Sequence, residues 1–397
     1  MKFYVGIDIA KHDHWVVVLD ESGKRHLSRK LTNTPEDLAR LVDELRALDG
    51  ERRVAIDVVG GIASLLTATL LQAGEPVVYV SGLAVNRSRD ALRGGENKSD
   101  PRDAQVIADL ARTRGDLRAV GVNDDVLVGL RLAVSRRRDL VVDQTRRIAR
   151  LHDLLVTVHP GLEAQLDLTT KSGLLLVESF VTPSELRAAG ADAVREHLVA
   201  RGVQARQAEK LAQAAVTAAR AQQLAIPGER FLAAQCRELA TEALAVRARI
   251  RRIEQDLEEL LPRTEHGAVV RSLPGMGVNL TAEFLVEVGD LDRFSGPDAL
   301  AMAAGLAPVL RQSGTVRFTR RNYKGDKNLK RILYQSAFAS LGHPASKAFY
   351  DRKRAEGKRH HQAVIALARR RINVLWALMR DRTPFDGEHR RPDAEAA

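Results

Sequence analysis

FYVGIDIA, at residues 3–10, decides the fold of the first part of this chain. The run is apolar and rich in strand-forming residues, yet it holds an aspartate, Asp8, between two isoleucines. Because side chains alternate along a strand, Gly6 and Asp8 share one face while Val5 and Ile7 share the other. A carboxylate on a buried strand is costly unless it has a partner, and Asp8 is therefore a candidate site residue.

Strand and helix patterns alternate on the C-terminal side of this run. HWVVVLD and RHLSRKLT predict two further strands, and TPEDLARLVDELRAL predicts a helix that opens with a Thr N-cap and a first-turn Pro. RRVAIDVVG and PVVYVS are two more strands, separated by a helical segment. Three strands followed by helix, strand, helix and strand predict an α/β domain on a mixed sheet, in the order of a ribonuclease-H-like fold.

The rest of the chain is expected to be helical. Two long amphipathic helices, at about 125–160 and 231–260, either pair as an antiparallel arm or dimerise as a coiled coil. The stretch between them is interpreted as short helices broken at Gly173, Pro183, Gly190, Gly202 and Pro227. The predicted organisation is an α/β domain at 1–122, a helical and coiled-coil region at 123–262, a mostly helical C-terminal domain at 263–384 and a disordered tail at 385–397.

Composition limits the partners of the protein. The 397 residues include 62 Lys and Arg against 51 Asp and Glu, a formal charge of +11. Such a balance suits a polyanion, although arginine is so common here that only clusters of it are informative. The single cysteine, Cys236, excludes an internal disulfide and a cysteine-built zinc site. With no signal-type run and no membrane span, we expect a cytoplasmic protein, associated with the nucleoid when bound to DNA.

Three further acids join Asp8 as candidates. Asp57 ends a strand in VAIDVVGG, and Asp100 and Asp103 lie three apart at the start of a helix, hence on one face. For Asp57, as for Asp8, the alternative explanation is capping of a loop or pairing with an arginine. For Asp100 and Asp103 the alternative is helix capping. If the four carboxylates converge, they repel one another, and a divalent cation such as Mg²⁺ is the usual remedy.

His12 and His14 flank the first strand but have no partner motif for a metal. We expect both to face solvent.

The C-terminal domain carries its own candidates. LPGMGVNLTAEFL has the shape of a helix-hairpin-helix, in which Gly275 and Gly277 allow a phosphate to approach closely. Two basic stretches are expected to contact nucleic acid. The first comprises Arg311, Arg317, Arg320, Arg321, Lys324, Lys327, Lys330 and Arg331. The second includes Arg352, Lys353, Arg354, Lys358 and Arg359.

Ser313 lies at the front edge of the first basic stretch. A lone serine in a turn is ordinarily a turn former. The cationic surroundings of this one would stabilise an alkoxide and a developing phosphoryl charge, which makes it a candidate nucleophile.

Six motifs, in order and spacing, resemble one protein family: GIDIAK, NKSDPRDA, LPGMG, AMAAGLAP, QSGT and YDRKRAEGKRHHQAVIALAR. They are similar to those of the DEDD-type insertion-sequence transposases, also called bridge-RNA-guided recombinases, and the likeness covers nearly the whole chain. The resemblance implies a RuvC-like N-terminal domain, a coiled-coil region for dimerisation and a C-terminal transposase domain.

The same resemblance implies a chemistry and its partners. Mg²⁺ would be bound by Asp8, Asp57, Asp100 and Asp103, and Ser313 would attack DNA to form a covalent phosphoserine link. A structured noncoding guide RNA would pair with double-stranded donor and target DNA, and the protein would act as a dimer or tetramer of identical chains. One departure concerns Asp57, where the family has Glu within E-x-T-G, so the metal geometry is expected to differ.

Three alternatives remain at this point. A Holliday-junction endonuclease would use the four acids without a serine. A non-catalytic nucleic-acid-binding protein would use the acids only as helix caps. A sugar-kinase-like actin fold also begins with a Gly-Ile-Asp strand but needs a phosphate-binding hairpin, which DESGK barely resembles.

Overall fold

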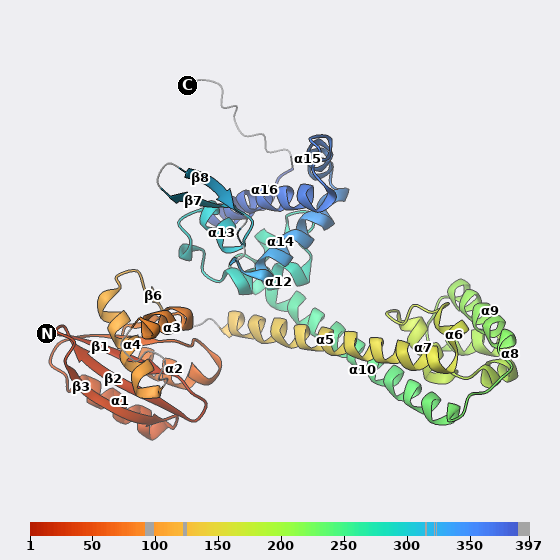
Figure 1. The fold of residues 1–397 in the computed structure, drawn as a ribbon, viewed down its shortest axis with the longest axis horizontal. Coiled ribbons are helices and arrows are strands. Elements are labelled where there is room, and N and C mark those ends of the chain that lie inside the picture. Colours follow the sequence, from red (N-terminus) through yellow and green to blue (C-terminus); the bar gives the residue numbers. More distant parts are fainter. Residues whose placement is uncertain (92–98, 122–124, 314–315, 321, 323, 388–397) are drawn as a thin grey trace. The chain divides into compact units, whose positions relative to one another are not determined.

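The computed structural model describes residues 1–91, 99–121, 125–313, 316–320, 322 and 324–387. The chain divides into two compact units, Met1–Asp124 and Asp125–Ala397 (Figure 1). Among the helices in the described ranges, none combines the length and apolar character needed to cross a membrane.

The first unit is built on a six-stranded mixed sheet with the order β3-β2-β1-β4-β5-β6. Its strands are β1 (Lys2–Asp8), β2 (Asp13–Asp20), β3 (Arg25–Thr32), β4 (Glu51–Ile56), β5 (Val77–Tyr79) and β6 (Arg118–Ala119). β1 pairs antiparallel with β2 and parallel with β4, and β4 pairs parallel with β5. The predicted mixed sheet and the order of its first five strands are confirmed, and the two-residue β6 is an addition.

Helices cover both faces of this sheet. They are α1 (Pro35–Arg46), the short η1 (Gly61–Ala63), α2 (Ser64–Gln72), α3 (Gly82–Asp90) and α4 (Asp100–Thr113). α1 begins as predicted, with Thr34 as N-cap and Pro35 in the first turn. On one face, Val5 and Ile7 of β1 pack in an apolar cluster with leucines of α1 and α2. Gly6 and Asp8 therefore belong to the opposite face.

α4 packs directly against that opposite face at Gly6. A Cβ atom placed on Gly6 would lie 2.2 Å from the carbonyl oxygen of Ala104 and 2.3 Å from the amide nitrogen of Ala108. Both of these atoms belong to the backbone of α4, so no side-chain movement could relieve the clash. The absence of a side chain at Gly6 is what lets a helix backbone lie on β1.

The second unit contains a pair of long helices, α5 (Asp125–Val158) and α10 (Glu229–Leu260) (Figure 1). Arg137 pairs with Glu254 at 2.8 Å and Arg147 with Glu242 at 2.9 Å. Residue numbers rise along α5 as they fall along α10, so the two helices are antiparallel. The structure therefore shows the antiparallel arm, while dimerisation through a coiled coil stays a prediction.

Four helices connect the distal ends of this pair: α6 (Pro160–Glu163), α7 (Lys171–Ser179), α8 (Pro183–Ala200) and α9 (Ala205–Ala221). The predicted breaks hold at Pro183, Gly202 and Pro227, and Gly190 has non-helical dihedral angles inside α8. The predicted break at Gly173 is wrong, because this residue lies within α7. A Cβ there would meet the Asp167 carbonyl oxygen at 2.4 Å, so a close contact explains this glycine.

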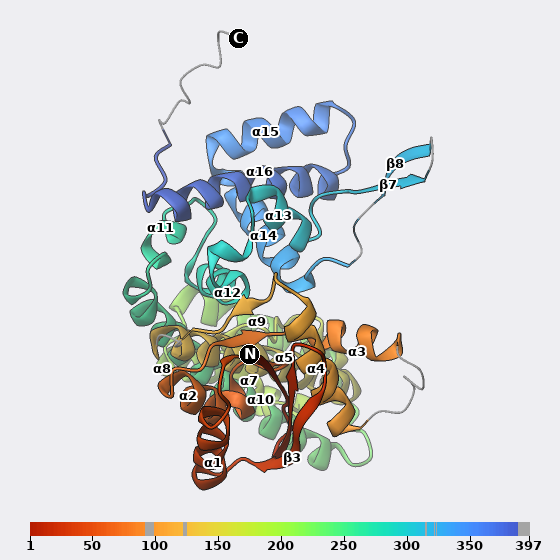
Figure 2. The same ribbon diagram turned by 90° about the vertical axis from the view of Figure 1, so that its left-hand side faces the viewer.

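The C-terminal helices pack around a single apolar core that includes Phe284, Ile332, Leu333 and Leu375. Its elements are α11 (Gly267–Arg271), α12 (Val278–Val288), α13 (Pro297–Ala303), α14 (Lys327–Ala339), α15 (Pro344–Ala355) and α16 (His360–Asp381), with the short helices η2 (Leu261–Arg263), η3 (Leu291–Arg293) and η4 (Ser340–Gly342). A two-stranded hairpin, β7 (Val309–Ser313) and β8 (Val316–Arg320), projects from these helices (Figure 2). Every residue of β8 is exposed. The prediction of a largely helical remainder is confirmed.

The expected disordered tail begins later than predicted. Phe385 is half-buried, donates its backbone N–H to the Ser272 hydroxyl at 2.7 Å and lies edge-on to His343. Residues 388–397 of the predicted tail lie outside the described part of the chain.

The contact at Gly6 gives a first prediction. Gly6→Ala should lower the free energy of unfolding by about 1–3 kcal/mol or more, because α4 must move off β1. Gly82→Ala is the matched control, since a Cβ at Gly82 meets no atom within 4 Å. Urea unfolding of the full-length chain measures both. Equal stability of the two variants would contradict the packing argument.

Candidate functional site

Asp8 and Asp57 lie side by side at the ends of two neighbouring parallel strands. The register pairs Ile7 with Ile56, so the two aspartates follow a matched pair of residues. The Ile9 N–H donates to Asp57 Oδ1 at 3.3 Å, which ties the two strand ends together. Both carboxylates are half-buried, and strand alternation places both on the face that α4 covers.

Asp103 reaches the same face from α4, where it is buried. One nitrogen of Arg89, on α3, donates to both of its carboxylate oxygens, at 2.8 and 3.0 Å. The hydrogen bond that Arg89 donates to Asp103 is the largest cause that raises the pKa of Arg89, and the charge of Asp8 contributes in the same direction. Asp8 and Asp103 therefore act electrostatically on one guanidinium.

Arg89 is a functional candidate that the sequence did not reveal. It stands among other arginines in NRSRDALRGG, where composition bias hides single residues. Its side chain is largely buried, with 11% of its surface exposed. Only the fold, which brings α3 beside α4, shows that this arginine differs from its neighbours.

The capping interpretation of Asp100 and Asp103 is wrong. The N-cap of α4 is Ser99, and Asp100 is the first helical residue, where it is exposed. Asp103 pairs with Arg89 instead of closing a capping box. Arginine pairing is an alternative that the sequence offers for Asp8 and Asp57, and the structure shows it at Asp103.

The prediction that both flanking histidines face solvent is wrong for His14. It is buried in β2, and its Nδ1 accepts the Ala10 N–H at 3.2 Å. Burial lowers the pKa of His14, so it is neutral at physiological pH. His12 is exposed, as expected.

The donor atoms of this face suit a hard cation, since Asp8, Asp57 and Asp103 offer carboxylate oxygens. Within the described ranges, however, no three histidine, cysteine, aspartate or glutamate side chains are placed to hold a metal ion. The guanidinium of Arg89 occupies both oxygens of Asp103. Three of the four predicted acids thus share a face, with an arginine as the positive charge among them.

Ser313 is the last residue of β7 and pairs with Val316 across the hairpin. It is exposed, and no described side chain hydrogen-bonds to its hydroxyl. A serine needs a base or a cationic environment to become nucleophilic. Among the described residues, no base is hydrogen-bonded to Ser313, while the arginines Arg317 and Arg320 lie on the strand that pairs with β7.

The first basic stretch separates into two groups. Lys330 donates to the Gly305 carbonyl oxygen at 3.2 Å, and Arg331 pairs with the buried Glu283, so both have structural contacts. Four others are exposed on the hairpin or just beyond it: Arg317, Arg320, Lys324 and Lys327. Arg321 lies outside the described residues, and for Arg311 only the backbone is described, in register with Phe318.

The second basic stretch forms the end of α15 and the turn into α16. Lys353 pairs with Glu356 at 2.8 Å, and Lys358 lies 3.7 Å from the same carboxylate. Arg354 donates to the Lys358 carbonyl oxygen at 2.8 Å, which closes the turn.

The two remaining arginines of this stretch, Arg352 and Arg359, are exposed. Arg352 stacks over the Phe349 ring, with 5.1 Å to the centroid.

The LPGMG turn is held by the C-terminal helices. The buried Arg371 donates to the Pro274 carbonyl oxygen at 2.6 Å and to the Ser336 hydroxyl at 2.7 Å. A Cβ on Gly275, which has a φ of 83°, would meet the Ser336 carbonyl oxygen at 2.4 Å. The close approach that Gly275 allows is therefore to its own chain. Gly277 is exposed at the start of α12 with open space around it.

Two family models match this chain. One, described as a transposase of the DEDD type found in IS110, matches residues 5–160. The other, described as a transposase of the IS116/IS110/IS902 family, matches residues 267–351.

Full-length relatives are similar along almost the whole sequence. An uncharacterised 42 kDa protein of insertion element IS900 from Mycobacterium paratuberculosis is 40% identical, over 96% of each chain. An uncharacterised 44.8 kDa protein of insertion element IS116 from Streptomyces clavuligerus is 38% identical, over 97% of this chain and 96% of the relative. A putative transposase of the IS117 mini-circle from Streptomyces coelicolor is 27% identical, over 96% and 95%.

Among solved structures, RuvC of Thermus thermophilus in complex with a Holliday junction substrate matches 30% of this chain and 100% of its own. The identity is 17% and the TM-score is 0.25.

The Arg89–Asp103 contact gives the second prediction. Arg89→Gln should lower the melting temperature, because Asp103 stays buried without its counter-charge. Mg²⁺ should then raise the melting temperature of this variant more than that of the wild type, since the acids are open to the cation.

Two controls sharpen this test. Arg89→Gln/Asp103→Asn should recover stability and lose the extra response to Mg²⁺. Arg112→Gln removes an arginine from an ion pair with Asp109 on the surface of α4 and should behave as the wild type. A response to Mg²⁺ that is the same in all four proteins would refute a cation-binding role for Asp103.

Proposed function

This chain belongs to the IS116/IS110/IS902 family of insertion-sequence transposases, and from that membership we propose that it cuts and rejoins DNA with two separate chemical groups. The first is the set of carboxylates beneath α4, and the second is the hydroxyl of Ser313. The observation that carries the proposal is the meeting of Asp8, Asp57 and Asp103 on one face of the sheet.

In this proposal the carboxylates hold Mg²⁺, with Asp100 as the fourth ligand. When bound, the cation would supply positive charge to a scissile phosphodiester. The protein fixes the ligand positions, because Asp8 and Asp57 are tied to adjacent strands and α4 rests on Gly6. Arg89 neutralises Asp103 until the cation arrives. The half-buried position of Asp57 beside Ile9 supports a ligand role for this shorter acid.

Ser313 is the proposed nucleophile. Its hydroxyl oxygen attacks the phosphorus atom, a serine–phosphate ester forms, and the strand leaves with its terminal hydroxyl. A strand hydroxyl then attacks the same phosphorus and releases the serine, so the number of phosphate ester bonds is conserved. The exposed hairpin supports this role, because a two-stranded ribbon fits the major groove of DNA.

The partners in this proposal are double-stranded donor and target DNA, with a structured noncoding RNA from the element as guide. Such a division leaves sequence recognition to base pairing and leaves shape and chemistry to the protein. The exposed cations of the hairpin, Arg317, Arg320, Lys324 and Lys327, support phosphate contact. We further propose an even-numbered assembly of identical chains, in which one chain supplies acids and another the serine.

Removing a carboxylate tests the metal site. Asp8→Asn should reduce strand cleavage by roughly a hundredfold or more, on a plasmid that carries the gene with its native flanking DNA, in buffer with Mg²⁺. Asp43→Asn, at an exposed position of α1, is the matched control. Deleting the flanking noncoding segments from the plasmid should also abolish cleavage. If the Asp8→Asn variant keeps full activity, the carboxylates are not catalytic and the proposed metal site is wrong.

Removing the hydroxyl tests the nucleophile. Ser313→Ala should eliminate the covalent protein–DNA adduct seen on a denaturing gel, because no ester can form. Thr319→Ala, an exposed hydroxyl on the same hairpin, should keep the adduct. Mixing Ser313→Ala with Asp8→Asn chains should restore part of the activity if the site is shared. Strand cleavage by Ser313→Ala without any adduct would instead favour a Holliday-junction endonuclease.

A further inference from the structure

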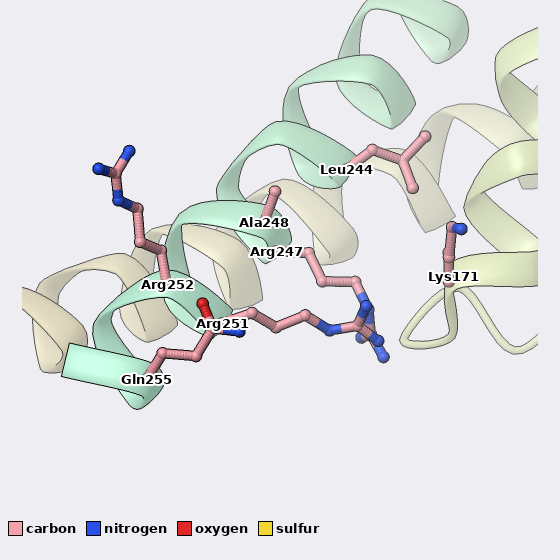
Figure 3. A pocket seen from close by; sticks show the side chains of 7 residues that line it. All are labelled: Lys171, Leu244, Arg247, Ala248, Arg251, Arg252 and Gln255. Atoms are coloured by element: carbon pink, nitrogen blue, oxygen red, sulfur yellow. The ribbon is translucent and has the colours of Figure 1, made fainter. Parts of the chain in front are cut away.

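A third group of cations lies in the middle of the sequence, outside the two basic stretches. It lines a pocket of about 350 Å³ between α10 and the start of α7 (Figure 3). Arg247 and Arg251 extend from α10 on the side where Lys171 stands, and Arg252 extends the other way (Figure 3). The lining is Lys171, Leu244, Arg247, Ala248, Arg251, Arg252 and Gln255. No acid is among these residues.

Among the described residues, two arginines of the pocket have no acidic partner, unlike some other arginines of the helix pair. Elsewhere on α5 and α10, arginines such as Arg137 and Arg147 face glutamates of the other helix. Within the described residues, no carboxylate lies within ion-pair distance of Arg251 or Arg252, and both are exposed. The pocket therefore keeps a positive charge that the chain itself does not neutralise.

The remaining two cations are fixed by backbone carbonyls. Arg247 donates to the Thr169 carbonyl oxygen at 2.9 Å, and Lys171 donates to the Arg201 carbonyl oxygen at 3.1 Å. These contacts orient the side chains without removing their charge. The Nε atom of Arg247 is buried and has no hydrogen-bond partner, so a donor is left over in the pocket. The charge of Arg247 is the smallest of the causes that lower the pKa of Asp167.

Like charges one helical turn apart repel, so Arg247 and Arg251 destabilise α10. An anion bound beside both side chains would remove this repulsion. A guanidinium is a planar donor that suits a phosphate oxygen. The two residues are spaced by about 6 Å along the helix axis, comparable with successive phosphates of one strand. The apolar Leu244 and Ala248 between the cations suit the sugar that links such phosphates.

We propose that this pocket binds the phosphodiester backbone of a nucleic acid. The site is separate from the acids and from the hairpin, and it gives a role to the helices between α5 and α10. The inference rests on the proposed function in one respect, which is that the partner of the chain is a nucleic acid. DNA and RNA share this backbone, and the experiment has an arm for each.

The test compares two double variants of the full-length chain, each of which loses two positive charges. Arg247→Gln/Arg251→Gln removes the two pocket cations that extend from α10 on the side of Lys171. Arg249→Gln/Arg206→Gln removes two exposed arginines that do not line the pocket, so the net charge falls equally. Fluorescence anisotropy measures the binding of a duplex DNA and of an RNA hairpin over a series of salt concentrations. Thermal unfolding checks that all proteins are folded.

Removal of two phosphate contacts should reduce the slope of log affinity against log salt by about 1.8 for duplex DNA. The control pair should keep the wild-type slope on both probes, and the probe whose slope falls identifies the nucleic acid. If the two double variants have equal slopes on both probes, the pocket does not bind the phosphodiester backbone, and the proposed function stays intact. A wild-type chain that binds neither probe would overturn both.

Discussion

The contact between Gly6 and the backbone of α4 is the constraint on which the face that carries Asp8, Asp57 and Asp103 depends. A helix can lie this close to a strand only where the strand lacks a side chain. The contact fixes how far Asp103 on α4 stands from Asp8 and Asp57 on the strands. Because backbone atoms meet on both sides, the spacing is set by main-chain geometry and not by adjustable side chains. Precise placement of carboxylates requires this kind of rigidity.

Electrostatics explains why the acids can share a face. Buried carboxylates that lie close together repel, and the folded chain needs a positive charge among them. Arg89 provides that charge from α3, with two contacts to Asp103. The pocket of the second unit differs, because its lining contains cations and no acid. One site thus carries its own counter-ion, and the other leaves its counter-ion to a partner.

The pattern of strands and helices could be predicted from the sequence, because alternation and capping are local. Asp8 and Asp57 could be found because an aspartate on an apolar strand is conspicuous. Arg89 could not, since nothing local distinguishes it from Arg87. The close contacts at Gly173 and Gly275 could not be predicted for a related reason. A glycine gives the same local signal whether it breaks a helix, meets a phosphate or admits a neighbouring segment of its own chain, and only the tertiary fold decides.

The antiparallel arrangement of α5 and α10 constrains how the chain can change its length. Each cross-helix ion pair joins residues that are far apart in sequence, such as Arg137 and Glu254. An insertion in one helix alone would shift every later pair out of register, so the two helices must lengthen or shorten together. The helices at the far end would then move outward or inward as one block, by about 5.4 Å for each whole turn added to both. Evolution could in this way change the length of the α5–α10 pair without altering a residue of either site.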